Sequence, residues 1–520
     1  MATGRFEELS GRVYPENLED QLKAVDSDPD VTNFQAAREH LASDSYRPIY
    51  HFTPPGSIMN DPNGLCQWQG RYHLFYQYRP SNVLDRVHWG HTVSDDLIHW
   101  QDLPIALYPD KEKDCYSGQT LVEPGRVIAI YHGTESGNSI ATASDPLLLN
   151  WEKHPENPVI PIVPIDENGS SYRVFDPAIW KEDDGYYAIS GTYKNGDRGD
   201  DAVGVDHLFR STDLAEWEYL GPLMEDSFHA EPGEDAAVPN FWPIGNGKHM
   251  LLLFSHKRAG RYYIGDYDET SHRFVPDYHG RMNYGPWTVG SLHAPSATID
   301  DSGRYLAFFN VKEGKPADGW DNIMTLPRHF SLREDDSLSI EPAPEVESLR
   351  FDHRSVDATD IPANGEIVLD GITGKAMEIE ATIEPGEARE VGLCVLRSPD
   401  GAERTRISYY PQDHRRFNHS SLQIDVSESS LRSDVFARTP EIGPIELDES
   451  EPLRLRIFID RSIVEVFANG RQCLTIRTYP EREDSNCVSI FARGANAKLV
   501  SLDSWQMRSV WPELSGREGA

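Results

Sequence analysis

The chain from His51 to about Arg333 consists of short apolar segments separated by turn-forming residues. These segments are rich in Tyr, Trp, Val and Ile, and Gly, Pro, Asn and Asp interrupt them every few residues. Helical periodicity is weak, whereas β-branched and aromatic runs bounded by turn formers are typical of strands. The pattern predicts an all-β domain over residues 47–335.

A weak internal repeat indicates how these strands are arranged. Ser, Asp and Leu precede a tryptophan in SDDLIHW (94–100), SDPLLLNW (144–151) and STDLAEW (211–217). A strand–turn–strand unit that recurs every roughly 50 to 70 residues is typical of the blades of a β-propeller. Because the domain has room for two further units, we predict a five-bladed β-propeller.

A second β-rich region follows an acidic, Pro-containing connector. Apolar and polar residues alternate in EPLRLRIFID and SIVEVFANGRQCLTIR, and Asn469-Gly470 is a turn signal, so this part predicts a hairpin within an antiparallel β-sandwich. We place the linker at 336–345, the sandwich at 346–512 and a tail at 513–520. Residues 1–46 form a polar extension in which a short helix is expected over about 32–42.

Composition restricts the possible partners. The 520 residues carry 85 acidic and 49 basic side chains, a formal net charge of -36, which disfavours nucleic acid and anionic membranes. No stretch approaches the roughly 18 apolar residues of a membrane span, and the first residues lack a secretory signal pattern, so a soluble, cytoplasmic protein is expected. The acidity is spread along the chain, which favours a role in solubility over adaptation to salt.

Three carboxylates stand among turn formers and aromatic residues. Asp61 lies in SIMNDPNGL, Asp176 in YRVFDPAIW and Glu234 in GEDAAVPNFWPIG. Taken singly, the two aspartates could be turn or cap residues, and Glu234 competes with Glu231 and Asp235 in an acidic loop. Hydrolysis of a glycosidic bond with retention needs two carboxyl groups roughly 5 to 5.5 Å apart, and these three acids are the candidates for them.

An ordered set of segments resembles glycoside hydrolase family 32, which contains invertases, inulinases, levanases and fructosyl transferases. The segments are HFTPPGSIMNDPNGL, YHLFYQYRP, WGHTVSDDLIHW, DCYSGQT, WDNIMTLPR and DRSIVEVFANG. The resemblance implies a hydrolase of terminal β-fructofuranosyl bonds in sucrose or fructo-oligosaccharides, with no cofactor. It also implies that Asp61 is the nucleophile, Glu234 the general acid/base and Asp176 the residue that holds fructose hydroxyls.

Two motifs depart from the family pattern. Phe175 stands where the family has the arginine of Arg-Asp-Pro, and Arg173 is the candidate to compensate for it. In place of Glu-Cys-Pro, the chain has Glu234-Asp235 followed by three small residues before Pro239. The resemblance further implies substrate-binding roles for hydrogen-bonding or stacking side chains, namely Asn60, Gln77, Trp89, Tyr116 and Ser117.

Several alternatives stay open at this point. A fructosyl transferase would use the same intermediate, and a sugar-binding protein without catalysis is suggested by Phe175. An arabinose-directed five-bladed enzyme is disfavoured by DRSIVEVFANG, which such enzymes should lack. His88 and His91 have no third ligand at a matching spacing, so no metal site is expected. A homo-oligomer is possible.

Overall fold

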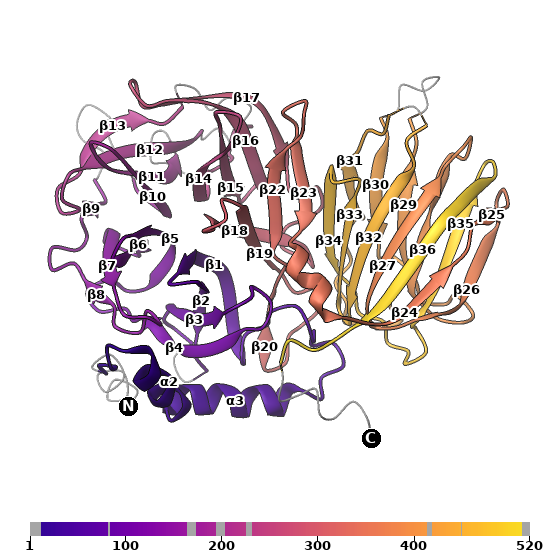
Figure 1. Cartoon of the computed structure of the whole chain (residues 1–520), viewed down its shortest axis with the longest axis horizontal. Helices are drawn as coiled ribbons and strands as arrows, with labels where there is room; N and C mark the ends of the chain where they lie inside the picture. The colour runs from indigo at the N-terminus through magenta and orange to yellow at the C-terminus, as the bar shows by residue number, and fades with distance from the viewer. Residues whose placement is uncertain are drawn as a thin grey trace.

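The computed structural model describes residues 12–81, 84–163, 173–193, 203–224, 231–412, 419–448 and 450–511. Two all-β domains lie side by side, a propeller formed by the first two thirds of the chain and a sandwich formed by the last third (Figure 1). The predicted fold class, a five-bladed β-propeller followed by an antiparallel β-sandwich, is confirmed.

The first four blades follow the chain in order, and each is an antiparallel sheet built outward from its first strand. The first blade contains β1 Ser57–Trp68, β2 Arg71–Arg79, β3 His88–Ser94 and β4 Gln101–Leu107, and the second contains β5 Cys115–Glu123, β6 Arg126–Gly133, β7 Gly137–Ala143, β8 Glu152–Lys153 and β9 Ile160–Pro161. The third contains β10 Pro177–Glu182, β11 Gly185–Tyr193, β12 Gly204–Ser211 and β13 Glu218–Pro222. The fourth contains β14 Ala237–Gly245, β15 Lys248–Ser255, β16 Ala259–Asp268 and β17 Arg273–Arg281.

The three sequence repeats are the turns that lead from the third to the fourth strand of the first three blades. In each turn the aspartate accepts hydrogen bonds from backbone N–H groups a few residues further on. A leucine in each turn is buried and has a positive φ: Leu97 69°, Leu148 51° and Leu214 69°. The repeat therefore encodes one turn geometry together with one packing contact.

The fifth blade extends into the segment predicted as a linker. It contains β18 Leu292–Ile299, β19 Tyr305–Val311, β21 Ile323–Met324, β22 Arg328–Leu332 and β23 Leu338–Pro342. β23 pairs with β22 as the outer strand. The short strand β20 (Trp320–Asp321) pairs in parallel with β1, which links the last blade to the first.

The sandwich begins after a 3₁₀ helix, η1 (Pro344–Leu349), and consists of two antiparallel sheets around their own apolar core. One sheet contains β24 Arg350–Val356, β25 Thr359–Ile361, β27 Ala376–Glu384, β32 Leu453–Asp460, β33 Ile463–Ala468, β34 Gln472–Arg477 and β36 Ala497–Met507, and the other contains β26 Glu366–Thr373, β28 Glu390–Arg397, β29 Thr405–Tyr410, β30 Ser421–Asp425, β31 Glu441–Pro444 and β35 Cys487–Arg493. The predicted hairpin is present: β33 and β34 flank Asn469 and Gly470, whose φ values are 50° and 63°.

The described part of the N-terminal extension, from residue 12 onward, contains two helices where one was predicted for the extension. α2 (Leu18–Asp26) was not expected, and α3 (Pro29–Leu41) begins before the predicted helix because Asp28 caps its N-terminus and Pro29 is its first residue. Arg38 attaches α3 to the first blade through two bonds to the carboxylate of Asp102, at 2.5 and 2.7 Å. Among the described helices, none is long and apolar enough to cross a membrane.

A buried polar cluster joins the sandwich to the segment that leads into β1. Asp460 accepts the backbone N–H groups of Ile49, Tyr50 and His51 at 2.8 to 2.9 Å. The two ring nitrogens of His51 lie 3.0 Å from Asp460 and 3.3 Å from Glu465. Both acids belong to the DRSIVEVFANG segment, so this motif has a structural role in orienting the chain that enters the propeller.

Glu465 also holds the fifth blade. Its carboxylate accepts bonds from the Leu326 N–H at 2.7 Å and from Arg328 at 2.8 Å, and all three side chains are buried. Burial alone would raise the pKa of Glu465, but the charge of Arg328 and the bond with His51 lower it to about 2. A charged group therefore bridges the two domains.

We expect Glu465→Gln to lower the free energy of unfolding by about 3 to 5 kcal/mol, because it leaves the buried charge of Arg328 without its partner. Chemical denaturation at neutral pH measures this loss. The matched control is Glu384→Gln, which removes only a half-exposed charge near Lys498 and should cost less than about 1 kcal/mol. Equal losses in the two variants would show that the cluster does not stabilise the fold.

Candidate active site

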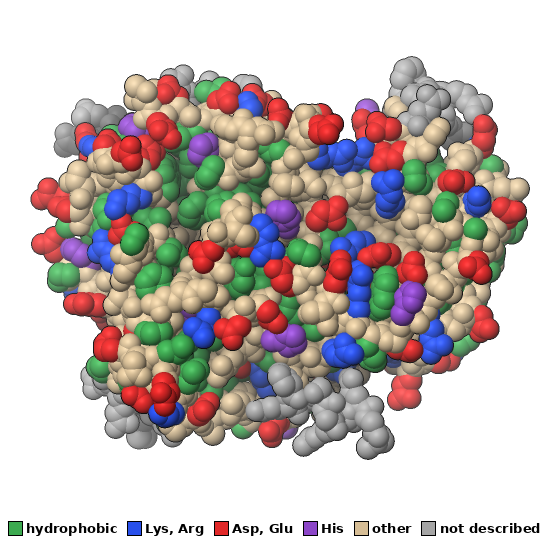
Figure 2. Space-filling view, in the orientation of Figure 1, with side chains coloured by type: hydrophobic (Ala, Val, Ile, Leu, Met, Phe, Trp, Pro, Cys, Tyr) green, Lys and Arg blue, Asp and Glu red, His purple; other side chains and the backbone are tan. Residues whose placement is uncertain are grey.

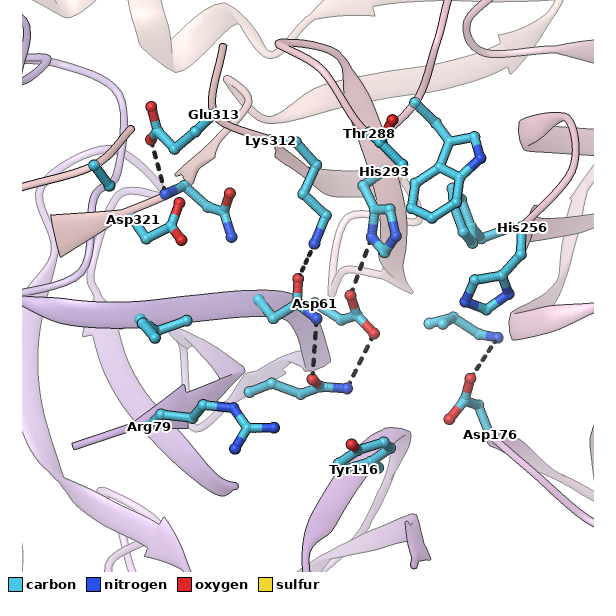
Figure 3. A pocket seen from close by; sticks show the side chains of 18 of the residues that line it. Asp61, Arg79, Tyr116, Asp176, His256, Thr288, His293, Lys312, Glu313 and Asp321 are labelled. Atoms are coloured by element: carbon cyan, nitrogen blue, oxygen red, sulfur yellow. Dashed lines mark hydrogen bonds and ion pairs between the residues drawn. The ribbon is translucent and has the colours of Figure 1, made fainter. Parts of the chain in front are cut away.

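A pocket of about 730 Å³ opens at the centre of the propeller, and all five blades contribute to its lining. Asp61 lies near its centre, with Tyr116 on one side and His293 and Lys312 on the other (Figure 3). The sandwich contributes Phe436 to the lining. Figure 2 shows acidic side chains scattered over the visible face of the protein rather than gathered in one patch.

Asp61 is a buried carboxylate surrounded by polar groups from different blades. Its Oδ2 accepts hydrogen bonds from Gln77 Nε2 at 3.0 Å and from Ser117 Oγ at 2.6 Å. Nδ1 of His293 lies 3.2 Å from the other oxygen. These groups come from β2, β5 and β18, so assembly of the propeller is what brings them to the carboxylate.

These contacts favour the ionised form of Asp61. Burial by itself raises the pKa of a carboxyl group, but the contact with His293, the charge of Lys312 and the bond from Ser117 lower the pKa of Asp61 to about 2. His293 is itself neutral near pH 7, since burial and the charge of Lys312 lower its pKa to about 4. Asp61 is therefore an ionised acid in a water-poor site, as a nucleophile must be.

Asp176 lines the same pocket from the start of the third blade. Its Oδ2 accepts the backbone N–H of Val238 at 3.3 Å. Burial and the negative charge of Asp61 raise the pKa of Asp176 to about 7. The structure thus brings together two carboxyl groups whose surroundings shift their pKa values in opposite directions, an arrangement typical of sites that catalyse acid/base chemistry.

Four of the predicted binding residues lie at or beside Asp61. Asn60, Gln77 and Tyr116 line the pocket. Gln77 connects Asn60 to Asp61, because its Oε1 accepts a bond from Asn60 Nδ2 at 3.3 Å. Ser117 is fully buried behind Asp61 and contacts the carboxylate from there.

Two other predicted binding residues lie elsewhere. Trp89 is 0% exposed and packs against Phe75, while its indole N–H donates to the Tyr116 carbonyl oxygen at 2.8 Å. Its position corrects the sugar-stacking role expected for it, since the ring fills the interior of the blade. Arg173 is exposed, with its guanidinium carbon 5.9 Å from the ring centre of Phe175; Phe175 lines the pocket, whereas Arg173 does not.

The structure does not bring Glu234 together with Asp61 and Asp176. Glu234 is 1% exposed and forms an ion pair with Arg261, and it accepts the Glu231 N–H at 2.7 Å. It lines a separate cavity of about 20 Å³ that it shares with Asp206 and Arg261. This space holds little more than one water molecule, and a sugar cannot enter it.

The neighbouring Asp235 lines the same small cavity, but it is linked to the pocket through a histidine. Its carboxylate binds His256, and the ring of His256 lines the pocket beside Trp287. Sequence reasoning singled out neither His256, His293, Lys312 nor Trp287. These residues stand in loops or at strand ends, and only their convergence in space marks them. Within the described residues, no group of three or more His, Cys, Asp or Glu side chains is arranged to hold a metal ion.

Family models match both domains. The description "Glycosyl hydrolases family 32 N-terminal domain" covers residues 51–342, and "Glycosyl hydrolases family 32 C terminal" covers residues 345–506. The chain belongs to glycoside hydrolase family 32. It is therefore a glycoside hydrolase, and the family resemblance predicted from its ordered motifs is confirmed.

Relatives within family 32 match over nearly the whole chain. A beta-fructofuranosidase, insoluble isoenzyme 7, from Oryza sativa subsp. indica is 30% identical, with 90% of each chain covered. A levanase from Bacillus subtilis is 29% identical over 93% of this chain and 74% of its own length. Among solved structures, fructan 1-exohydrolase IIa from Cichorium intybus has a TM-score of 0.79 at 26% identity, covering 90% of this chain and 98% of its own.

We expect Ser117→Ala to raise the pKa of Asp61, since it removes a hydrogen bond to the charged form. The acidic limb of kcat/KM, where activity is lost as Asp61 gains a proton, should then move upward by roughly one to two pH units. Profiles on the glycoside that the enzyme hydrolyses measure the shift. The control is Ser296→Ala, which removes a buried hydroxyl bonded to Gln119 rather than to Asp61. An unmoved limb in Ser117→Ala would contradict the role assigned to this bond.

Proposed function

We propose that this family 32 enzyme hydrolyses terminal β-fructofuranosyl bonds, as in sucrose and short fructans, with retention of configuration. The observation that carries the proposal is Asp61: an ionised carboxylate with a pKa of about 2, placed at the centre of a pocket that five blades line. Relatives named beta-fructofuranosidase and levanase support fructose as the sugar that is released.

In the proposed reaction, an oxygen of Asp61 attacks the anomeric carbon C2 of the fructosyl unit. The C2–O bond to the leaving sugar breaks, and a proton donor in the pocket protonates the leaving oxygen. Water then attacks C2, its proton returns to the same group, and the ester to Asp61 breaks. Two inversions at C2 give net retention.

The other pocket groups fit a neutral furanose. Asn60, Gln77, Tyr116 and Lys312 present hydrogen-bonding atoms around Asp61, and Trp287 offers an aromatic face. Asp176, across the pocket from Lys312, is proposed to bind fructose hydroxyls. A variant of the chicory exohydrolase has been solved in complex with 1-kestose, which supports short fructans as substrates to test.

The test is incubation with sucrose, 1-kestose, inulin and levan, followed by chromatography of the products. We expect free fructose in proportion to substrate consumed, and early NMR spectra showing the β-anomer first. Longer oligosaccharides would instead indicate fructosyl transfer. No product from any of the four substrates would contradict the proposal and favour sugar binding without catalysis.

Asp61→Asn should lower kcat/KM by at least about 10⁴-fold, because the amide cannot attack C2. Asp300→Asn is the matched control: Asp300 is buried in the fifth blade, where it binds Arg304 away from the pocket. This second variant should lose stability but keep its activity per folded molecule. Activity of Asp61→Asn close to that of the wild type would exclude Asp61 as the nucleophile.

A further inference from the structure

The proposed reaction needs a proton donor in the pocket, and Glu234 lies outside it. Two histidines in the pocket are poor proton donors because they are neutral near pH 7: burial lowers the pKa of both His132 and His293 to about 4. Nδ1 of His132 bonds to Asn138, and Nδ1 of His293 lies 3.2 Å from both Asp61 and Asn310. The pocket also contains the carboxyl group of Asp176 and the imidazole of His256.

His256 is held for proton transfer by a single carboxylate. Asp235 Oδ2 lies 2.6 Å from Nδ1 of the ring, and its Oδ1 accepts the backbone N–H of His256 at 2.8 Å. The carboxylate of Asp235 is only 9% exposed, whereas the side chain of His256 is 51% exposed. Because Nδ1 is bound to the carboxylate, this clamp favours the hydrogen on Nδ1 and makes Nε2 the ring nitrogen that can serve a ligand in the pocket.

The register of the fourth blade places Asp235 and His256 together, with His256 lining the same pocket as Asp61. Ala237 of β14 lies opposite Phe254 of β15. Because strand side chains alternate between faces, Asp235 and His256 continue the same face two residues beyond this pair. Ala237 is the residue two positions before Pro239, where Glu-Cys-Pro would have its glutamate. The chain therefore has a methyl group at that position, and His256 lies two residues beyond Phe254, the cross-strand partner of Ala237.

We propose that His256 is the proton donor and subsequent general base of this enzyme, with Asp235 as its positioning residue. The proposal rests on the function proposed above. In the first step the Nε2 proton of His256 passes to the glycosidic oxygen as Asp61 forms its bond to C2. In the second step neutral His256 takes a proton from the water that attacks C2, which restores the imidazolium and the free carboxylate.

The charges around His256 support this cycle. Burial alone would lower its pKa, but the bond to Asp235 and the negative charges of Asp235, Asp176 and Asp61 raise it above the ordinary value. The ring of the neutral His293 is centred 6.4 Å away and that of Trp287 5.7 Å away. When Asp61 becomes an ester it loses its charge, so the pKa of His256 falls as its role changes from acid to base.

Asp176 is less suited to this role. One of its oxygens, Oδ2, is already engaged by the Val238 N–H, although burial and the negative charge of Asp61 raise the pKa of Asp176 to about 7. Figure 3 shows His256 and Asp176 on the same side of Asp61, and the ring centre of His256 lies 5.7 Å from that of Trp287. Asp176 is therefore positioned to hold the sugar while His256 faces its leaving group.

The test compares sucrose with p-nitrophenyl β-D-fructofuranoside, whose leaving group needs little protonation. In His256→Gln, kcat/KM for sucrose should fall about 10²- to 10⁴-fold, and kcat/KM for the nitrophenyl substrate less than about tenfold. Added azide should restore kcat on the nitrophenyl substrate by attacking the intermediate without a base. The control is His249→Gln, which changes a histidine of β15 outside the pocket. This variant should keep the wild-type kcat/KM for both sucrose and the nitrophenyl substrate.

Asp235→Asn removes a charge that raises the pKa of His256, so the basic limb of kcat/KM should move to lower pH. A purely structural role of Asp235 would leave the basic limb at its wild-type pH.

The inference is overturned if His256→Gln affects both substrates equally, or if the selective loss on sucrose appears in Asp176→Asn or Glu234→Gln instead. Failure of the wild type on both substrates would refute the proposed function itself, a separate result.

Discussion

The active site depends on one constraint: a carboxylate removed from water must stay ionised. Asp61 meets it because Gln77, Ser117 and His293 surround its two oxygens from three different blades. None of these groups is near Asp61 in sequence, so the low pKa exists only when the ring of blades is assembled. Folding and the chemistry of the site are linked through this carboxylate.

The sandwich contributes to the same constraint from outside the pocket. Asp460 and Glu465 bind the chain at His51, ten residues before Asp61, and Glu465 also binds Arg328 of the fifth blade. The sandwich thus fixes the two parts of the chain between which the propeller closes. The charged motif therefore acts on the fold of the propeller, while Phe436 is the only described residue of the sandwich that lines the pocket.

Much of this could be predicted from the sequence, because the signals are local. The repeats encode a turn in which an aspartate bonds to the backbone and a leucine packs inward, and Asn469-Gly470 encodes a hairpin. The position of Glu234 could not be predicted, since a difference of one residue decides whether an acid faces Arg261 or His256. Trp89 was misread for a similar reason: aromatic residues in blades serve packing as well as binding, and only burial distinguishes the two roles.

The central claim is that Asp61 forms a covalent bond to fructose. The most direct measurement is mass spectrometry of protein quenched in acid during turnover of p-nitrophenyl β-D-fructofuranoside, with His256→Gln used to slow hydrolysis of the intermediate. We predict one added fructosyl unit on the peptide that contains Asp61, and none in the same peptide of Asp61→Asn. An adduct on another carboxylate, or burst release of nitrophenol with no adduct on Asp61, would contradict the account.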